Sequence, residues 1–336
     1  MAIQELLPNL AMCSSMGRMK RASIAVFLLL GACAREQPRS TVSGPPEVEA
    51  TAAVITAFTE GPAADAEGNV FFTETINQRI MKMAPDGTLT VFREHSNNAN
   101  GLLFDDQFRL LACEGAPSKG ALYQDSRPRV TRTVMRTGKV EVLASDYNGQ
   151  PFVSPNDITM DGKGRLYFTD LPGGAVYRID TDGKLSRILY KPEIQRPNGI
   201  EISPDDKTLY LVEANQAEGG ARMIRAYDLL PDGAVANMRV FHDFYPGRSA
   251  DGMCIDTRGN LYAAAGLHQR RGTSETLKTR CGVHVFAPNG DLIRFIAIPE
   301  DTITNCAFGG PDMKTLYVTA GKGLYQTQVE IPGTRR

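Results

Sequence analysis

Six oxygen-bearing side chains recur at a near-constant distance ahead of an apolar strand pattern. Each stands 10 to 12 residues before the aromatic or aliphatic centre of one such pattern. The six are Glu60, Asn100, Asn156, Asn198, Asp251 and Asn305. Equivalent positions of a radial repeat converge on its axis, so we expect these side chains to meet in one small central volume. Two carboxylates and four carboxamides suit a hard divalent cation.

A simpler interpretation is that these residues only form turns between strands, a role that Asn and Asp often take. That interpretation explains Asn100 and Asn305 as well as a site does, but Glu60 is a poor turn residue. Burying several inward oxygens without a cation would also be costly. We therefore expect one divalent ion, held by Glu60, Asn156, Asn198 and Asp251. Ca²⁺ is preferred for an all-oxygen set, with Zn²⁺, Mn²⁺ or Mg²⁺ as alternatives.

The elements that position these residues are short β-strands. The apolar, β-branched and aromatic patterns that follow turn residues cover 68–74, 108–114, 164–170, 207–213, 259–265 and 314–320. Most are followed by a hairpin whose turn is Pro-Asp-Gly, Thr-Asp-Gly or Pro-Asn-Gly, a pattern typical of paired strands. No long apolar pattern of period 3.6 occurs between them.

Six repeats of this kind predict an all-β fold, a six-bladed β-propeller with a central metal site. A β-sandwich or barrel is the rival fold, but neither requires an equal phase over so much of the chain. We expect residues near Val54–Phe58 to close the ring by pairing with the last blade. Three long connections, 114–127, 214–222 and 266–280, should form the walls of a mouth above the axis, with His268 as a candidate substrate-binding residue.

The first 50 residues do not fit the repeat. Arg18, Lys20 and Arg21 precede a short apolar run, 22–30, and Leu30-Gly31-Ala32-Cys33 is similar to a bacterial lipobox. We expect residues 1–33 to be a leader, 34–50 a flexible tether and 51–336 the propeller. The protein would then be exported to the periplasm and anchored to the outer membrane through a lipid on Cys33. A cleaved signal peptide without a lipid is the alternative.

Charge and cysteine content limit the binding partners and the metal sites that can be expected. With 37 Lys and Arg against 38 Asp and Glu, the net charge of −1 gives no reason to expect nucleic acid as a partner. The spacing of Cys113, Cys254, Cys281 and Cys306 does not fit a zinc site. Cys254 and Cys306 lie within apolar strand patterns and are expected in the core, whereas the sequence leaves a Cys113–Cys281 disulfide open. We expect a monomer or weak dimer.

Several local motifs resemble one known family. FTEGP at 58–62, SPNDI at 154–158, RPNGI at 196–200, ADGMCID at 250–256 and NCAFGGPDMKTLYVT at 305–319 are similar to the senescence marker protein/regucalcin/gluconolactonase family. The resemblance covers about Thr51 to Gln328. It implies a six-bladed propeller that hydrolyses lactones, with Glu60, Asn198 and Asp251 as metal ligands. It also implies that Asn156 contacts substrate and approaches the metal, and that Asp251 doubles as general base.

One position departs from the pattern of the family. Members that act on sugar lactones often carry an Arg two residues before the counterpart of Asn156, and this chain has Ser154. Recognition of a sugar lactone would need another residue, and Arg222, Arg270 and Arg271 of the long connections are candidates. Asn100, Asn156, Asn305 and His268 are the other expected substrate contacts.

Three functions are compatible with this scaffold. A metal-dependent lactonase is favoured by the family motifs; the metal would polarise the ester carbonyl and Asp251 would take a proton from the attacking water. A phosphotriesterase-like or strictosidine-synthase-like enzyme is the second. A non-catalytic ligand-binding propeller is the third, although it would not need two axial carboxylates, Glu60 and Asp251.

Overall fold

The computed structural model describes residues 47–115 and 127–335. They belong to one compact unit, residues 44–336. The predicted leader 1–33 with Cys33, residues 34–46 of the predicted tether and residues 116–126 of the first long connection lie outside the described residues. The described part of the chain has no helix that is long and apolar enough to cross a lipid bilayer.

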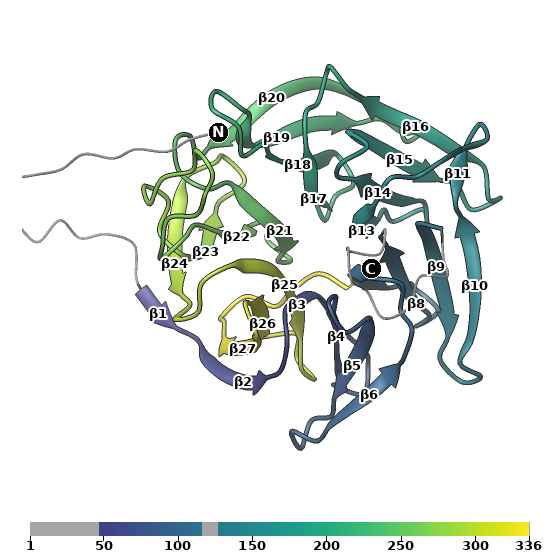
Figure 1. Ribbon diagram of the computed structural model, residues 1–336, viewed down its shortest axis with the longest axis horizontal. Helices are drawn as coiled ribbons and strands as arrows, with labels where there is room; N and C mark the ends of the chain where they lie inside the picture. The colour runs from purple at the N-terminus through teal and green to yellow at the C-terminus, as the bar shows by residue number, and fades with distance from the viewer. Residues whose placement is uncertain (1–46, 116–126, 336) are drawn as a thin grey trace, which may run out of the picture. The chain divides into compact units, whose positions relative to one another are not determined.

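Six antiparallel sheets follow one another around a central axis, as Figure 1 shows. Blade one contains β3 (Thr59–Ala64), β4 (Val70–Glu74), β5 (Arg79–Met83) and β6 (Leu89–Arg93). Blade two contains β7 (Ala99–Phe104), β8 (Leu110–Glu114), β9 (Arg129–Val134) and β10 (Lys139–Ala144). Blade three contains β13 (Pro155–Met160), β14 (Leu166–Asp170), β15 (Ala175–Ile179) and β16 (Leu185–Tyr190).

The second half of the ring is built in the same way. Blade four contains β17 (Pro197–Ile202), β18 (Thr208–Ala214), β19 (Arg222–Leu229) and β20 (Val235–Asp243). Blade five contains β21 (Ala250–Ile255), β22 (Leu261–Ala265), β23 (Gly282–Phe286) and β24 (Leu292–Ala297). Blade six contains β25 (Ile303–Gly309), β26 (Thr315–Ala320), β27 (Gly323–Gln328) and β2 (Thr51–Ile55). A small hairpin, β11 (Asp146–Tyr147) with β12 (Gln150–Pro151), lies between blades two and three.

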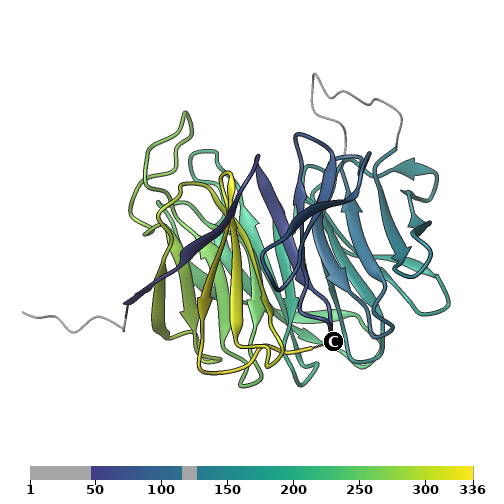
Figure 2. The same cartoon turned by 90° about the horizontal axis from the view of Figure 1, so that it is seen from below.

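The predicted all-β, six-bladed propeller is therefore confirmed, and each predicted apolar pattern coincides with the second strand of a blade, although β18 extends one residue further, to Ala214. The first strand of each blade is innermost and contacts the first strands of both neighbouring blades, which closes the ring. Figure 2 shows the strands running between two faces of the ring, with the C-terminus at the lower face. We call the face where the inner strands begin the upper face.

The ring is closed by strands from both ends of the chain. As predicted, the segment before Phe58 pairs with the last blade, because β2 runs antiparallel to β27, with Ile55 opposite Gly323. A further strand, β1 (Glu47–Glu49), pairs in parallel with β24 and makes blade five a five-stranded sheet. The last residues of the predicted tether 34–50 are thus strand rather than free chain.

The core consists of apolar clusters that each join two neighbouring blades. Leu211 and Ile200 of blade four pack with Tyr167 and Val176 of blade three, for example. Both faces of a blade are covered in this way, which explains why β4, β8, β14 and β22 are buried along their whole length. Outer strands such as β6, β10 and β20 are partly exposed.

The four cysteines of the propeller are free thiols. A Cys113–Cys281 disulfide does not form, because Cys113 lies in blade two and Cys281 precedes the third strand of blade five. Cys254 and Cys306 are buried in the cluster between blades five and six, as their apolar surroundings predicted.

Candidate active site

A cavity of about 230 Å³ opens at the upper end of the axis. Its wall includes the four predicted metal ligands, Glu60, Asn156, Asn198 and Asp251. They come from blades one, three, four and five, so residues nearly 200 positions apart in the chain (251 − 60 = 191) share one cavity. We call this cavity, lined by these four residues, the upper pocket. Their roles in binding a metal remain predictions.

The inner strands of blades three, four and five present Asn156, Asn198 and Asp251 through a shared irregularity. In blades two to five, the first and second strands form one residue pair, and then two residues of the first strand lie opposite a single residue of the second before regular pairing resumes. Asn156 lies in this shift between Pro155 and Ile158, and Asn198 and Asp251 occupy the same place in their blades. Such a bulge turns a side chain out of the regular alternation, here toward the axis.

A threonine on the second strand holds the backbone of the next blade's axial residue. Thr73 Oγ1 donates to the carbonyl of Asn100 at 3.1 Å, and Thr169 Oγ1 donates to the carbonyl of Asn198 at 2.8 Å. Both threonines are fully buried. Small residues complete the close approach, since a Cβ on Gly199 would lie 2.4 Å from the carbonyl oxygen of Asp251.

Blade six departs from the predicted phase by one residue. Ile303 pairs with Ala320 as Ala250 pairs with Ala265, so Thr304 occupies the axial position and Asn305 the position after it. Asn305 Nδ2 instead donates to Oδ2 of Asp157 at 3.3 Å. Both line a second cavity at the lower end of the axis, which we call the lower pocket, and neither lines the upper pocket.

Two further predicted substrate contacts also lie outside the wall of the upper pocket. Asn100 sits at the axial position of blade two but does not line the cavity. His268 is exposed in the connection 266–280, and its Nε2 pairs with the carbonyl of Ile298 at 2.8 Å. The structure therefore brings together Asn156 and the three other predicted metal ligands, but not Asn100, Asn305 or His268.

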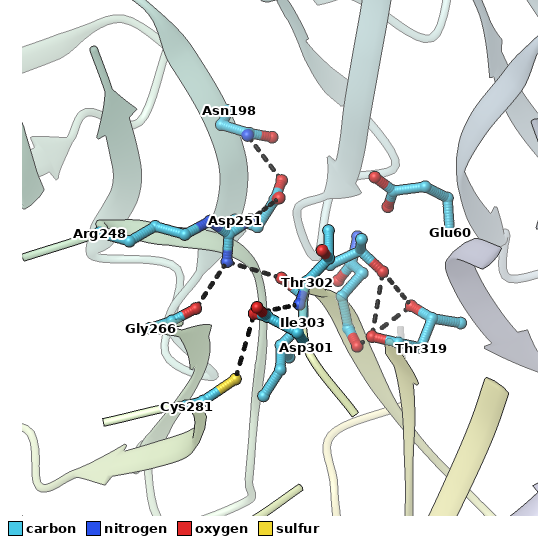
Figure 3. Close-up of polar contacts among 12 residues, drawn as sticks. Glu60, Asn198, Arg248, Asp251, Gly266, Cys281, Asp301, Thr302, Ile303 and Thr319 are labelled. Atoms are coloured by element: carbon cyan, nitrogen blue, oxygen red, sulfur yellow. Dashed lines mark hydrogen bonds and ion pairs between the residues drawn. The ribbon is translucent and has the colours of Figure 1, made fainter. Parts of the chain in front are cut away.

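Both carboxylate oxygens of Asp251 have partners. Asn198 Nδ2 donates to Oδ1 at 2.6 Å, and Arg248 donates to Oδ2 at 2.5 Å. Arg248 is itself fixed, because it also donates to the carbonyl of Ile303 at 2.8 Å. Figure 3 shows Asn198 and Arg248 reaching Asp251 from two sides, with Glu60 across the cavity. The Asp251 side chain is thus held in one orientation while remaining 16% exposed.

The electrostatics of Glu60 and Asp251 differ. Burial raises the pKa of Glu60 well above its usual value, and the charges of Asp251 and Asp157 raise it further. Within the described part of the chain, the Glu60 carboxylate accepts only a long hydrogen bond, 3.4 Å, from the adjacent amide of Gly61. Burial also raises the pKa of Asp251, but Arg248 and the hydrogen bond from Asn198 oppose that shift. Two buried carboxylates near each other, one poorly paired, attract a cation.

The donor set fits a hard divalent ion, although the described residues hold no group of three or more His, Cys, Asp and Glu side chains suited to a metal. Glu60 and Asp251 supply two carboxylates. Asn198 directs its Nδ2 at Asp251, which leaves its Oδ1 turned away from that carboxylate (Figure 3). Asn156 adds a second amide oxygen. Such a set depends on water for its remaining ligands, as Ca²⁺ and Mg²⁺ sites commonly do.

The three arginines that could replace the Arg missing from the family pattern have different surroundings in the structure. Arg222 is only 1% exposed and donates to the carbonyls of Asn215, Ala217 and Pro246, so it holds loops together. Arg270 is exposed and does not line the upper pocket. Arg271 does line it and contacts Thr302, which leaves Arg271 as the candidate that the geometry supports.

Sequence reasoning missed three charged residues of the pocket wall. These are Arg196, Arg248 and Glu275. Arg196 directly precedes the Pro197-Asn198 pair, and Arg248 stands three residues before Asp251. The two arginines could have been found by considering the residues that lead into an axial position, because these residues must line the rim of the same cavity. Glu275 lies inside a long connection, and no pattern in the sequence marks it.

Replacing Arg248 by Met should shift the pH dependence of turnover. Arg248 lowers the pKa of Asp251, so its loss lets that pKa rise and leaves Asp251 protonated up to a higher pH. If Asp251 is the base, as the sequence predicts, it is active only when deprotonated, so the acidic limb of a plot of kcat/KM against pH should move to higher pH. A profile with the limb unmoved would contradict this coupling. Arg165→Met is the control, because Arg165 pairs with Asp161 outside the upper pocket.

Comparison with known proteins agrees with the motifs. Residues 58–322 match the family described as SMP-30/Gluconolactonase/LRE-like region. A gluconolactonase of Zymomonas mobilis is 28% identical over 307 residues, which cover 82% of this chain and 80% of that protein. A lactonase drp35 of Staphylococcus saprophyticus is 28% identical over 253 residues, covering 69% of this chain and 70% of that protein.

Solved structures show the same fold. The gluconolactonase XC5397 of Xanthomonas campestris superposes with a TM-score of 0.67 at 28% identity, covering 83% of this chain and 87% of that one. A calcium-binding regucalcin of Agrobacterium tumefaciens superposes with a TM-score of 0.68 at 19% identity, covering 86% and 97%, and supports the fold alone. The resemblance predicted from the motifs is confirmed, and the chain belongs to the SMP-30/gluconolactonase/LRE-like family.

Proposed function

We propose that this protein is a lactonase that opens a small, polar lactone in the upper pocket with the help of one divalent cation. The proposal rests on the two carboxylates that line this pocket, Glu60 and Asp251. Glu60 accepts only a long hydrogen bond, whereas Asp251 is held in place by Asn198. The names of the relatives, gluconolactonase and lactonase, support the reaction class.

The cation would be held by Glu60, Asn156, Asn198 and Asp251, and when bound it would polarise the carbonyl of the lactone. Ca²⁺ is the first choice for these oxygen ligands. Glu60 faces the cavity without a cationic partner of its own among the ion pairs of the described residues. Its role is therefore to bind charge rather than to move a proton.

Asp251 acts as the general base. It accepts a proton from water while the water oxygen bonds to the carbonyl carbon, and the bond from that carbon to the ring oxygen then breaks. The ring oxygen takes up the proton and becomes a hydroxyl group, so one hydroxy acid leaves. Arg248 keeps the Asp251 carboxylate aimed and lowers its pKa, which favours the deprotonated state that the reaction needs.

The wall of the upper pocket favours a polar substrate of small size. Arg196, Gln216, Arg271 and Glu275 are available for hydroxyl groups, and about 230 Å³ admits a single ring. Arg271 lies on the connection 266–280 and would take over the contact that Ser154 cannot make. The substrate class inferred from these groups is a hydroxylated five- or six-membered lactone.

Hydrolysis of a lactone panel tests the proposal. The full-length protein is treated with a chelator, then supplied separately with Ca²⁺, Zn²⁺, Mn²⁺ or Mg²⁺ and assayed on sugar lactones and unsubstituted aliphatic lactones. We expect turnover only with added metal and a preference for the hydroxylated rings. Metal binding without turnover of any lactone would overturn the lactonase and favour a phosphotriesterase-like reaction or a binding propeller.

A further inference from the structure

Two buried thiols face each other across the boundary of blades five and six. Cys254 lies on the inner strand β21 and Cys306 on the inner strand β25, and their sulfur atoms are 3.3 Å apart. They are separated by 52 residues in the chain. The thiol of Cys306 also contacts the carbonyl oxygen of Tyr262 at 3.4 Å. Neither thiol lines the upper pocket.

Both thiols can be approached from the lower pocket. This cavity has a volume of about 340 Å³, and Cys254 and Cys306 belong to its wall together with Met253 and Phe308. The two other cysteines of the propeller, Cys113 and Cys281, do not line it. A small reagent that enters the lower pocket would therefore meet a pair of thiols.

We propose that Cys254 and Cys306 form a disulfide that links the inner strands of blades five and six when the protein meets a small disulfide oxidant. The sulfur atoms must approach by about 1.2 Å, because a disulfide bond is about 2.05 Å long. Rotation of the two side chains can supply this movement, since the lower pocket leaves free space beside them. Their strands are neighbours in the ring and need not change partners.

The reaction is an ordinary thiol–disulfide exchange. One protein thiol, as its thiolate, attacks a sulfur of the oxidant, forming a mixed disulfide and releasing one reduced thiol. The second protein thiol attacks the protein sulfur of that mixed disulfide and releases the second reduced thiol. Two electrons pass from the protein sulfurs to the oxidant, and the two protons end on the released thiols. Burial raises the pKa of Cys254, so the reaction should be slow at neutral pH and faster at alkaline pH.

The cross-link would act on the least continuous part of the ring. Blade six is assembled from both ends of the chain, with β2 from the N-terminal side and β25, β26 and β27 from the C-terminal side. A bond from β21 to β25 ties this composite blade to blade five and restricts the unfolded chain. We expect the thermal midpoint to rise by roughly 5 °C on oxidation.

Peptide mapping provides a direct test, because trypsin places the four propeller cysteines on separate peptides. The peptides are 110–119 with Cys113, 249–258 with Cys254, 281–294 with Cys281 and 295–314 with Cys306. Native full-length protein is incubated with bis(2-hydroxyethyl) disulfide, denatured, alkylated without reduction, digested and analysed by mass spectrometry. The expected product is peptide 249–258 joined to 295–314, lighter by two hydrogen atoms than their sum, while Cys113 and Cys281 remain alkylated.

Variants separate the cross-link from general oxidation. Cys254→Ser should remove both the joined peptide and the rise in thermal midpoint, and Cys281→Ser should keep both. The wild-type mapping stands alone if a variant does not fold. Full alkylation of Cys254 and Cys306 after oxidation at alkaline pH, a stable adduct of either thiol with the reagent, or linkage to another cysteine would each overturn the proposal.

Discussion

Replacing Asp251 by Asn should lower kcat/KM for lactone hydrolysis by about 10²- to 10⁴-fold, the usual contribution of a general base. The Asn side chain keeps the shape of Asp and can still accept a hydrogen bond from Asn198 or Arg248, but it cannot accept a proton from water. The assay is steady-state hydrolysis of the best lactone of the panel across a range of added metal up to saturation. Saturation matters because Asp251 is also a predicted metal ligand, and lost binding must be distinguished from a lost base.

The control for this variant is Asp105→Asn. Asp105 is also a buried carboxylate, but it lines the lower pocket and pairs with Arg109. We expect it to change the thermal midpoint more than the activity. If Asp251→Asn at saturating metal keeps kcat/KM within a few-fold of the wild-type value, another group must take the proton, and the pocket offers Glu275 for that role.

Most of the fold could be predicted from the sequence repeat. Strand patterns such as 164–170 and 259–265 correspond closely to β14 and β22, because turn residues, β-branched residues and aromatic residues all favour the same local structure there. The number of patterns then predicted the number of blades. Closure by the segment near Val54 followed from the shortage of strands at the C-terminal end.

The axial residues were predictable where the strand carried a shared irregularity. Asn156, Asn198 and Asp251 lie at equivalent places in their blades, and a count from the next strand finds them. The same count fails for Asn305. The spacing between axial residue and strand centre already varies by two residues among the blades, so it cannot reveal an error of one residue. Only the pairing of Ile303 with Ala320 reveals that Thr304 is axial.

Side-chain roles in long connections were not predictable from residue type. Arg222, Arg270 and Arg271 look alike in the sequence, yet one is buried among carbonyls, one is exposed and one lines the upper pocket. Their fates depend on how the connections fold over the ring, which no local pattern records. Arg248 belongs to no motif, and its role follows from its contact with Asp251.

Removal of the cation should destabilise the protein more at neutral pH than at acidic pH. The pKa of Glu60 is raised in the folded chain, so without metal the folded state binds this proton more tightly than the unfolded state. The stability that this group contributes is present below its unfolded pKa and is lost as the pH rises toward its folded pKa. A bound cation favours the ionised carboxylate, so the difference in thermal midpoint between metal-loaded and chelated protein should grow as the pH rises from about 4.3, the usual value for Glu.

Glu60→Gln tests the same carboxylate with two effects of opposite sign. Without metal, the variant should be more stable than the wild-type protein at neutral pH, because it lacks a poorly paired buried charge. With metal it should lose stabilisation, since its affinity is expected to fall at least about tenfold, or about 1.4 kcal/mol. Ions at 100 times their Kd stabilise a wild-type site by about 2.7 kcal/mol, so calorimetric titration and thermal unfolding can both detect the loss.

Glu74→Gln is the matched control, because Glu74 is equally buried in blade one but accepts from the amide of Ala57 and pairs with Arg79 outside the upper pocket. Its metal titration should equal that of the wild-type protein. If Glu60→Gln also leaves the titration unchanged, Glu60 is not a ligand. If it weakens binding without stabilising the chelated protein, the carboxylate has a partner in the metal-free state. The proposed site requires both effects together, because one buried charge accounts for the affinity and for the instability that the cation relieves.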